Sequence, residues 1–375
     1  MPASGDGLLL RELRLKDFRN YPAFCLGDIG PLTAFVGPNA VGKTNIIEAI
    51  RMVTTLSSFR SAHIEEMIGW GSSSARIDAR LVSEVRDLDV SVELKPGQKL
   101  CLLNGKRKTT QDVQGLLPSV GFSPEDLALV KGSNSLRRNA LDALGCQLSK
   151  NHRVIKRDYE KLIRHKNALL KEESSDSLLD AVDAMLALTG SQLYRYRIAL
   201  FDHLAARLPE VYARISDQKE AISLEYEPSW VSYGFNGGDF DPQEALNSAL
   251  HLVRQEEKAR RRCVVGPHVD RVTVKIWGRD ASSFASQGQQ RSIVLAWKIA
   301  EVELITEIAG VKPVLLLDDV MSELDANRRH ALVDFLLQDI QTFITTTDMS
   351  FFEPSIIERA RIIELPEGQE GSWVK

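Results

Sequence analysis

Cysteine is scarce in this sequence, and its four cysteines lie far apart. Cys25, Cys101, Cys146 and Cys263 form no CxxC pair, which excludes a cysteine-rich zinc site and a dense disulfide framework and fits a reducing cytosol. No apolar run approaches the roughly 18 residues that a membrane-spanning helix needs. The first residues also lack the basic-then-apolar pattern of a signal peptide. We therefore expect a cytoplasmic protein that does not span a membrane.

An excess of positive charge is also missing. The 47 Lys and Arg residues are outnumbered by 51 Asp and Glu residues, so the formal net charge is −4. Bulk charge therefore does not identify a nucleic-acid-binding protein, and any such surface must come from local clustering of basic side chains. The content of 43% apolar and 26% charged residues is that of an ordinary globular chain.

The length of 375 residues favours two domains, or one domain with a large insertion. Residues 1–134 alternate strand-like and helical patterns, and an Asn-Gly pair at 104–105 between extended runs predicts a β-hairpin. Residues 135–260 are mostly helical in pattern, and residues 261–375 return to alternating strands and helices. We expect an α/β fold in which a mostly helical lobe at 135–260 is inserted into a nucleotide-sized domain.

A phosphate-binding loop is the strongest motif in the chain. The pattern GxxxxGK[ST] is matched at every fixed position by the segment Gly37, Pro38, Asn39, Ala40, Val41, Gly42, Lys43 and Thr44. In such loops the backbone N–H groups turn toward phosphate oxygens, Lys43 reaches the β- and γ-phosphates, and the Thr44 hydroxyl ligates Mg²⁺. The alternative is a fortuitous Gly-rich turn, but a buried strand is predicted before the motif and a helix after it. We therefore expect a nucleotide site with Mg²⁺, in which Lys43 has a catalytic role.

A second motif lies where an apolar run, residues 314–317, ends in Asp318 and Asp319. A buried strand with an acid at its C-terminal tip holds the metal ion beside the phosphate loop in P-loop NTPases. We assign Asp318 to Mg²⁺ and Asp319 to the water that attacks the γ-phosphate. The alternative is an ordinary strand whose end is solvated by two acids. The phosphate loop in the same chain favours the catalytic interpretation.

A third motif decides the class of protein. Ser286, Gly288 and Gln289 match S-x-G-Q before an amphipathic helix, and this pattern resembles the signature motif of ATP-binding-cassette (ABC) ATPases. A hydroxyl and a glycine at a helix start supply donors for a phosphate, so the motif is a second anion site. A serine N-cap on a surface helix is the plainer alternative. In the ABC superfamily, one phosphate loop and one signature per chain imply ATP sites completed across a head-to-tail dimer.

The chain as a whole resembles the RecF family, in the SMC-like branch of these ATPases. The resemblance rests on the blocks LKDFRNY, the phosphate loop continuing as NIIEAI, FSPEDLALVKGSNSLRRNALD, GPH, FASQGQQR and LLLDDVMSELDANRR. It implies an ABC-type P-loop ATPase head with the inserted helical lobe and no long coiled coil. Arg19, Asn20 and Asn45 fall in these blocks and are implied to contact the nucleotide. After GPH the chain has Val-Asp-Arg, where the family usually has Arg-Asp-Asp.

The resemblance also implies a function. It implies a weak, DNA-stimulated ATPase that binds ATP and Mg²⁺, forms an ATP-dependent homodimer, clamps double- or single-stranded DNA and releases it on slow hydrolysis. It further implies roles in recombinational gap repair, replication restart and the SOS response. In these the protein would help RecR and RecO load RecA on single-stranded DNA, with RecR as the direct partner. The alternative is an SMC-like DNA-binding module whose nucleotide is structural and is not turned over.

Basic clusters are the candidates for DNA contacts. Clustered Lys and Arg side chains hold phosphates by charge and counterion release, even on an acidic chain. The candidates follow the predicted hairpin turn or lie on a helix predicted at 150–171, and they are Lys106, Arg107, Lys108, Arg153, Lys156, Arg157, Lys161 and Arg164. A solvated helix face explains any one of these runs equally well. The sequence shows no base-reading motif beside them, so we expect binding that is independent of DNA sequence.

Overall fold

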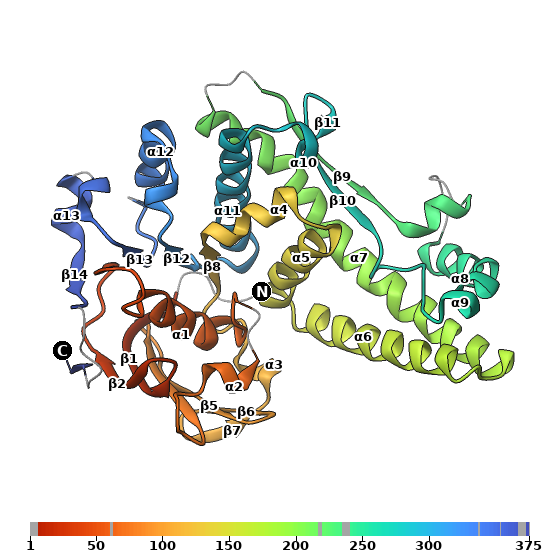
Figure 1. The fold of residues 1–375 in the computed structure, drawn as a ribbon, viewed down its shortest axis with the longest axis horizontal. Helices are drawn as coiled ribbons and strands as arrows, with labels where there is room; N and C mark the ends of the chain where they lie inside the picture. The colour runs from red at the N-terminus through yellow and green to blue at the C-terminus, as the bar shows by residue number, and fades with distance from the viewer. Residues whose placement is uncertain are drawn as a thin grey trace. The chain divides into compact units, whose positions relative to one another are not determined.

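The chain folds into two compact units, whose elements Figure 1 shows. This computed structural model describes residues 7–60, 63–216, 220–234, 241–336, 338–352, 354–366 and 373–374. Unit 1 consists of Met1–Asp126 and Lys298–Lys375, and unit 2 consists of Leu127–Trp297. The insertion that we expect at 135–260 lies within unit 2. The signature segment also belongs to unit 2, and the boundary between the units falls inside α11 (Gln287–Ala309).

Unit 1 contains a mainly antiparallel sheet and a parallel sheet. The antiparallel sheet runs, in spatial order, through β15 (Trp373–Val374), β2 (Tyr21–Leu26), β1 (Leu9–Phe18), β4 (Ala75–Val82), β5 (Asp87–Lys95), β6 (Gln98–Leu103) and β7 (Lys106–Lys108). The parallel sheet runs through β14 (Arg361–Glu364), β3 (Leu32–Val36), β13 (Thr342–Thr346), β12 (Val314–Asp318) and β8 (Ser119–Phe122). Because parallel strands end at the same edge, the segments after β3, β12 and β13 meet there.

The predicted hairpin is confirmed between β6 and β7. Leu103 pairs with Lys106 across the turn. Asn104 (φ 50°) and Gly105 (φ 72°) both adopt the left-handed conformation. Two such residues form the type I′ turn that matches the twist of the flanking strands, and asparagine and glycine tolerate it best.

The helix after the phosphate loop, α1 (Lys43–Thr55), lies between the two sheets of unit 1 (Figure 1). Ile46 and Ile50 of α1 share one hydrophobic core with Leu13 of β1 and Phe343 of β13, and all four side chains are fully buried. The loop at the start of α1 is therefore anchored to both sheets. Other helical segments of unit 1 are α2 (Ile64–Met67), α3 (Thr110–Val113), η3 (Met321–Glu323), α12 (Ala326–Leu336), η4 (Met349–Phe351) and α13 (Pro354–Arg359).

Unit 2 is mostly helical. α6 (Lys150–Lys171) packs along α7 (Asp176–Ile215), and α8 (Pro242–Leu252) packs against α7 as well (Figure 1). A small antiparallel sheet pairs β11 (Arg279–Asp280) and β9 (Ile222–Glu227) with β10 (Arg271–Ile276). Other helical segments are η1 (Pro124–Leu127) at the boundary, α4 (Ala128–Lys131), α5 (Asn134–Leu148), η2 (Ser229–Tyr233), α9 (Arg254–Arg260) and α10 (Ala281–Phe284).

Among the described residues, the helices form neither a long coiled coil nor a membrane-spanning segment. As expected, they form no long coiled coil, although α7 alone runs for 40 residues and contains Pro209. No helix in these ranges is long and apolar enough to cross a lipid bilayer.

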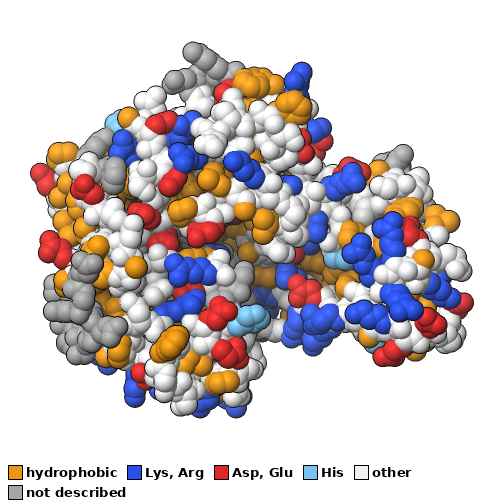
Figure 2. All heavy atoms as spheres, in the orientation of Figure 1, with side chains coloured by type: hydrophobic (Ala, Val, Ile, Leu, Met, Phe, Trp, Pro, Cys, Tyr) orange, Lys and Arg blue, Asp and Glu red, His pale blue; other side chains and the backbone are white. Residues whose placement is uncertain are grey.

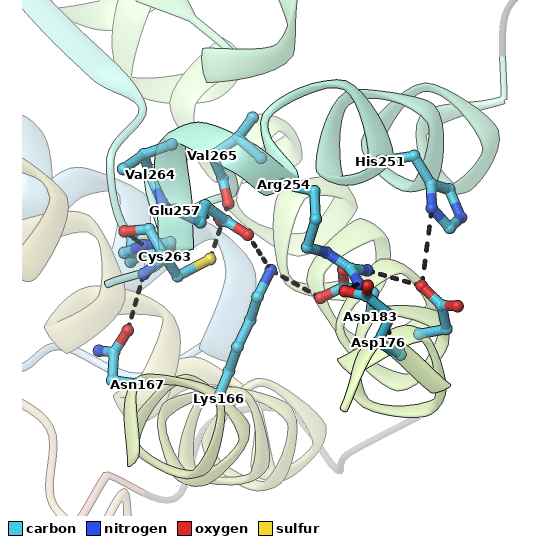
Figure 3. A network of polar contacts seen from close by, with 12 residues as sticks. Lys166, Asn167, Asp176, Asp183, His251, Arg254, Glu257, Cys263, Val264 and Val265 are labelled. Carbon is cyan, nitrogen blue, oxygen red and sulfur yellow. Dashed lines mark hydrogen bonds and ion pairs between the residues drawn. The ribbon is translucent and has the colours of Figure 1, made fainter. Parts of the chain in front are cut away.

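A buried ion network joins three helices of unit 2 (Figure 3). The Nζ atom of Lys166 on α6 lies 2.6 Å from a carboxylate oxygen of Asp183 on α7 and 2.5 Å from one of Glu257 on α9. All three side chains are fully buried. Arg254 lies 2.7 Å from the other carboxylate oxygen of Asp183. Burial alone would lower the pKa of Lys166, but the nearby negative groups outweigh it and the pKa lies above its ordinary value.

We predict that Lys166→Met lowers the free energy of unfolding by about 3–5 kcal/mol, because it leaves Glu257 buried without the counter-charge of the lysine and leaves Asp183 paired with Arg254 alone among the described residues. Denaturant unfolding at neutral pH, followed by circular dichroism, measures the change. Lys161→Met removes an exposed lysine from the same helix and should change the value by less than about 0.5 kcal/mol. Equal effects of the two substitutions would contradict a stabilising role for the network.

Candidate nucleotide-binding site

The phosphate loop connects β3 to α1 at the carboxyl edge of the parallel sheet. Its backbone turns through the left-handed region at Ala40 (φ 68°) and Gly42 (φ 105°). A Cβ atom at Gly42 would collide with the side chains of Asn20 and Tyr21, so glycine is required both by its conformation and by its neighbours. The N–H of Asn45 donates to the Gly42 carbonyl oxygen at 2.9 Å. The helix therefore begins directly at the loop, and its N-terminus is directed at the place where a phosphate would bind.

The Lys43 side chain folds back over the loop. Its Nζ donates hydrogen bonds to the carbonyl oxygens of Gly37 (2.6 Å) and Pro38 (2.8 Å), and only 6% of the residue is exposed. Burial lowers the pKa of Lys43, and the carboxylates of Asp319 and Asp318 oppose this shift. The ammonium group is thus held beside the loop, where phosphate oxygens could replace the two carbonyls as acceptors.

The Asp318 carboxylate lies at the tip of β12 and accepts hydrogen bonds from two hydroxyls. Its Oδ1 accepts from Thr44 Oγ1 at 2.9 Å and from Thr345 Oγ1, on β13, at 2.7 Å. Burial raises the pKa of Asp318, while the two hydrogen bonds oppose the shift. A hydroxyl and a carboxylate are hard oxygen ligands, which suit Mg²⁺. The structure brings Thr44 and Asp318 together and adds Thr345, a contact that the sequence did not predict.

Asp319 follows in a left-handed backbone conformation (φ 53°). Its N–H bonds to the Oγ1 of Thr345 at 2.9 Å and to the carbonyl oxygen of that residue at 3.2 Å. Its Oδ1 is buried and has no hydrogen-bond partner among the described residues. Burial raises the pKa of Asp319, and Lys43 opposes the shift. A buried acceptor without a partner and with a raised pKa is suited to bind a water molecule and take its proton.

A cavity of about 540 Å³ opens beside the loop. Asn20 donates to the Val41 carbonyl oxygen at 3.2 Å, and Asn45 donates to Asn20 at 2.8 Å, so both amides border the loop. The lining of the cavity includes Arg19, Asn20, Asn45, Arg60 and Trp70. The ring of Trp70 is fully exposed. The sequence does not identify Arg60 and Trp70 as wall residues, because neither has a fixed spacing to the loop that a motif could reveal.

Arg19, which the family resemblance implies to contact the nucleotide, is held in place by other residues of the protein. Its guanidinium group donates two hydrogen bonds of 2.8 Å to the buried carboxylate of Glu48. It donates a third, also of 2.8 Å, to the carbonyl oxygen of Glu66. Because the group has five N–H donors, a nucleotide in the cavity would meet the remaining donors and the flat face of a fixed guanidinium.

The signature serine caps a helix in unit 2. The Oγ of Ser286 accepts the N–H of Gln289 at 3.2 Å, and the Gln289 side chain accepts the N–H of Ser286 at 2.7 Å. This reciprocal pair is a capping box. Ser286 therefore acts as the N-cap of a helix, which was the plainer alternative for this motif. Gln289 also donates to Glu220 at 2.7 Å. Capping does not exclude anion binding, because other N–H groups at a helix start, such as that of Gly288, have no partner within the helix.

The basic candidates fall into two groups, one in each unit. Lys106, Arg107 and Lys108 make up β7, an exposed edge strand. The other candidates lie on α6, and Figure 2 shows Lys and Arg side chains gathered along that helix. Lys156 and Arg164 line a pocket together with residues of α5 and α7, whereas the other candidates on α6 do not line it.

The parallel sheet, the loop after β3, the acid at the tip of β12 and the S-x-G-Q helix start together define an ABC-type P-loop ATPase head. A family model described as the RecF/RecN/SMC N terminal domain matches residues 9–365. The DNA replication and repair protein RecF of Thermosynechococcus vestitus is 36% identical over 367 residues, which cover 96% of each chain. This chain belongs to the RecF family.

Two solved structures share this fold. A structure of the recombination mediator protein RecF with ATP in the RecFOR pathway superposes with a TM-score of 0.86 at 30% identity, covering 94% of this chain and 95% of that one. The Smc head domain from Pyrococcus furiosus superposes with a TM-score of 0.55 at 15% identity, covering 95% and 93%. The second similarity shows a shared fold alone.

Asp318→Asn should separate stability from nucleotide binding. Folding raises the pKa of Asp318, so its charge destabilises the protein at neutral pH, and this effect disappears as the pH falls below the pKa of the unfolded state. Asparagine keeps an acceptor oxygen for Thr44 and Thr345 but carries no charge. We expect the variant to melt at a higher temperature than the wild type without nucleotide, yet to bind Mg²⁺·ATP at least roughly tenfold more weakly.

Thermal unfolding at pH 7, with and without Mg²⁺·ATP, measures both effects of this substitution. Asp334→Asn, which changes an exposed aspartate of α12 in the same unit, is the matched control and should alter neither. A variant that lost stability and kept its affinity for Mg²⁺·ATP would contradict both the electrostatic argument and the metal role.

Proposed function

We propose that this chain is an ATP-dependent DNA-binding protein of recombinational gap repair that works as an ATP-driven dimer. The observation that carries the proposal is the meeting of Lys43, Thr44 and Asp318 at one edge of the parallel sheet. Membership in the RecF family supports it, as do a relative named for DNA replication and repair and a relative solved with ATP.

ATP and Mg²⁺ are the ligands of the proposed site. Lys43 and the N–H groups of residues 37–44 would bind the phosphates, and Thr44 and Asp318 would hold the metal ion. The bound ion would neutralise phosphate charge. The exposed ring of Trp70 offers a flat apolar surface in the cavity beside the loop, which suits the base of the nucleotide.

Asp319 is the proposed general base. Its Oδ1, which has no hydrogen-bond partner among the described residues, would hold the attacking water, and its raised pKa makes it a better proton acceptor than an ordinary aspartate. The aspartate side chain is one methylene shorter than the glutamate that most of the superfamily uses. We therefore propose a weak ATPase, and its stimulation by DNA is proposed from the family resemblance.

A second copy of the chain completes each nucleotide site in this proposal. The helix start at Ser286, Gly288 and Gln289 would bind the γ-phosphate of the ATP that the other copy holds. ATP would thus join the copies head to tail. The dimer would clamp single- or double-stranded DNA through its backbone phosphates, without reading bases, and slow hydrolysis would release it.

The proposed biological role follows the family. In the cytoplasm the protein would act in gap repair, replication restart and the SOS response, helping RecR and RecO load RecA on single-stranded DNA. RecR would be the direct partner.

Ser286→Arg tests completion of the site by a second copy. The long charged side chain would fill the space in front of the α11 N-terminus, so ATP should still bind each chain but should no longer produce dimers. Sedimentation velocity with and without Mg²⁺·ATP measures the dimer, and a fluorescent ATP analogue measures nucleotide binding.

Two control variants accompany this experiment. Ser133→Arg makes the same change at the start of another helix of unit 2, α5, and should leave the ATP-dependent dimer intact. Lys43→Ala should abolish ATP binding itself. If Ser286→Arg still dimerised with ATP like the wild type, completion of the site by a partner would be refuted.

Asp319→Asn tests turnover. The amide cannot take a proton from water, so we expect ATP hydrolysis to slow by roughly 100-fold or more, ATP binding to persist and the ATP-dependent dimer to last longer. Single-turnover hydrolysis and dimer decay are the measurements, with Asp334→Asn as the control. Hydrolysis at the wild-type rate would remove Asp319 from the mechanism. A wild-type protein that binds ATP but never hydrolyses it would favour the alternative of a structural nucleotide.

A further inference from the structure

Unit 2 contains a pocket of about 290 Å³ that takes no part in the proposed nucleotide site. It opens between one face of α5 and one face of α6, with further lining from α7 and from His268. We call it the α5–α6 pocket. The polar side chains that decide its chemistry are Ser135, Arg138, Asn139, Lys156, Arg164 and Arg197.

Two of the basic side chains are already neutralised by acids in the pocket wall. Arg197 donates to the two carboxylate oxygens of Asp142 at 3.1 and 3.0 Å. Burial would raise the pKa of Asp142, but Arg197 and a hydrogen bond with His152 outweigh it and hold the pKa at about 2. Lys156 forms an ion pair with Glu160. These two pairs leave no net charge.

Arg138 and Arg164 are the charges that remain. Neither forms an ion pair with an acid in the part of the chain that the structure covers. Arg138 is half-buried and donates to the carbonyl oxygen of Asp270 at 2.5 Å. Burial lowers the pKa of Arg138 and the adjacent Arg197 lowers it further, while the nearby Asp270 and Asp142 oppose the shift without reversing it. His268 adds no charge at neutral pH, because burial lowers its pKa to about 4. Two positive charges therefore remain among the lining side chains, and one of them is partly withdrawn from water.

We infer that the α5–α6 pocket binds one phosphate group through Arg138 and Arg164. Guanidinium groups present paired N–H donors that match phosphate oxygens, and Ser135 and Asn139 add neutral donors from the same face of α5. The volume of about 290 Å³ lies at the lower limit of the range typical of drug-sized ligands. The ring of Tyr159 in the wall is buried, so it offers no exposed face on which a base could stack.

The phosphate can belong to a DNA backbone or to a free phosphate compound, and the DNA backbone is the source that we favour. Lys156 and Arg164 place the pocket on the helix along which Lys and Arg side chains gather (Figure 2). Binding of a DNA phosphate rests on the proposed function, in which the chain binds DNA. Binding of a free phosphate compound does not rest on it, so the two are tested separately.

The first arm measures binding of a fluorescent duplex to the full chain with Mg²⁺·ATP over a series of salt concentrations. Arg138→Gln and Arg164→Gln should each weaken binding several-fold and reduce the slope of log K against log[salt] by about one per lost phosphate contact. Arg195→Gln, which removes the same charge from an exposed position on α7, should change neither. Thermal melting checks folding, and because Arg164 is exposed, its variant keeps the test valid if Arg138→Gln unfolds.

The second arm titrates inorganic pyrophosphate calorimetrically while ADP·Mg²⁺ occupies the nucleotide site. Loss of pyrophosphate binding in both pocket variants, with DNA binding unchanged, would support a free phosphate compound as the ligand. Wild-type behaviour of both variants in both arms, or equal losses in Arg195→Gln, would overturn the pocket. If the wild-type chain bound no DNA, the proposed function would fail in that respect, and the pyrophosphate arm alone would decide the pocket.

Discussion

The candidate nucleotide site depends on how one buried carboxylate is satisfied. Asp318 ends a strand whose every residue is buried, so its charge is tolerated only with hydrogen-bond donors beside it. Thr44, at the start of α1, and Thr345, at the end of β13, supply them. The bonds that stabilise the charge therefore also fix the phosphate loop and two strands at one edge of the sheet. A metal ion placed between Thr44 and Asp318 would relieve the same buried charge, so structural and catalytic requirements coincide.

Two groups of buried charges in unit 2 are satisfied by opposite charges. Lys166 lies between Asp183 and Glu257, and Arg197 is paired with Asp142. Both groups join helices that are separate in the sequence, and removing Lys166 or Arg197 would leave a desolvated carboxylate, Glu257 or Asp142, without its basic partner. In the α5–α6 pocket this pairing of charges is incomplete, because the basic side chains of the lining outnumber the acidic ones. In our proposal, the phosphate supplies the negative charge that the pocket wall lacks.

Motifs were predictable where chemistry dictates both residue type and spacing. The phosphate loop, the apolar strand ending in Asp318 and the Asn-Gly turn all have local rules, and the structure contains each as a loop, strand tip or hairpin. The length of α7 was not predictable, because Pro209 argues against an uninterrupted helix. Arg19 shows another limit, because only the fold reveals that Glu48 binds its guanidinium group. Trp70 could not be predicted as part of the cavity wall, because no motif fixes its distance in sequence from the phosphate loop.

Net charge is a poor guide to the partners of this chain, for a physical reason. At physiological ionic strength exposed charges are screened beyond about 8 Å, so a DNA phosphate responds to the nearest side chains and not to the total of −4. Most acids near the basic side chains of α6 are engaged locally, as Glu160 is with Lys156. A phosphate then meets the basic side chains that form no ion pair within the described ranges, such as Arg164. Counting unpaired cations on each surface, which requires the fold, is therefore more informative about anionic partners than the isoelectric point.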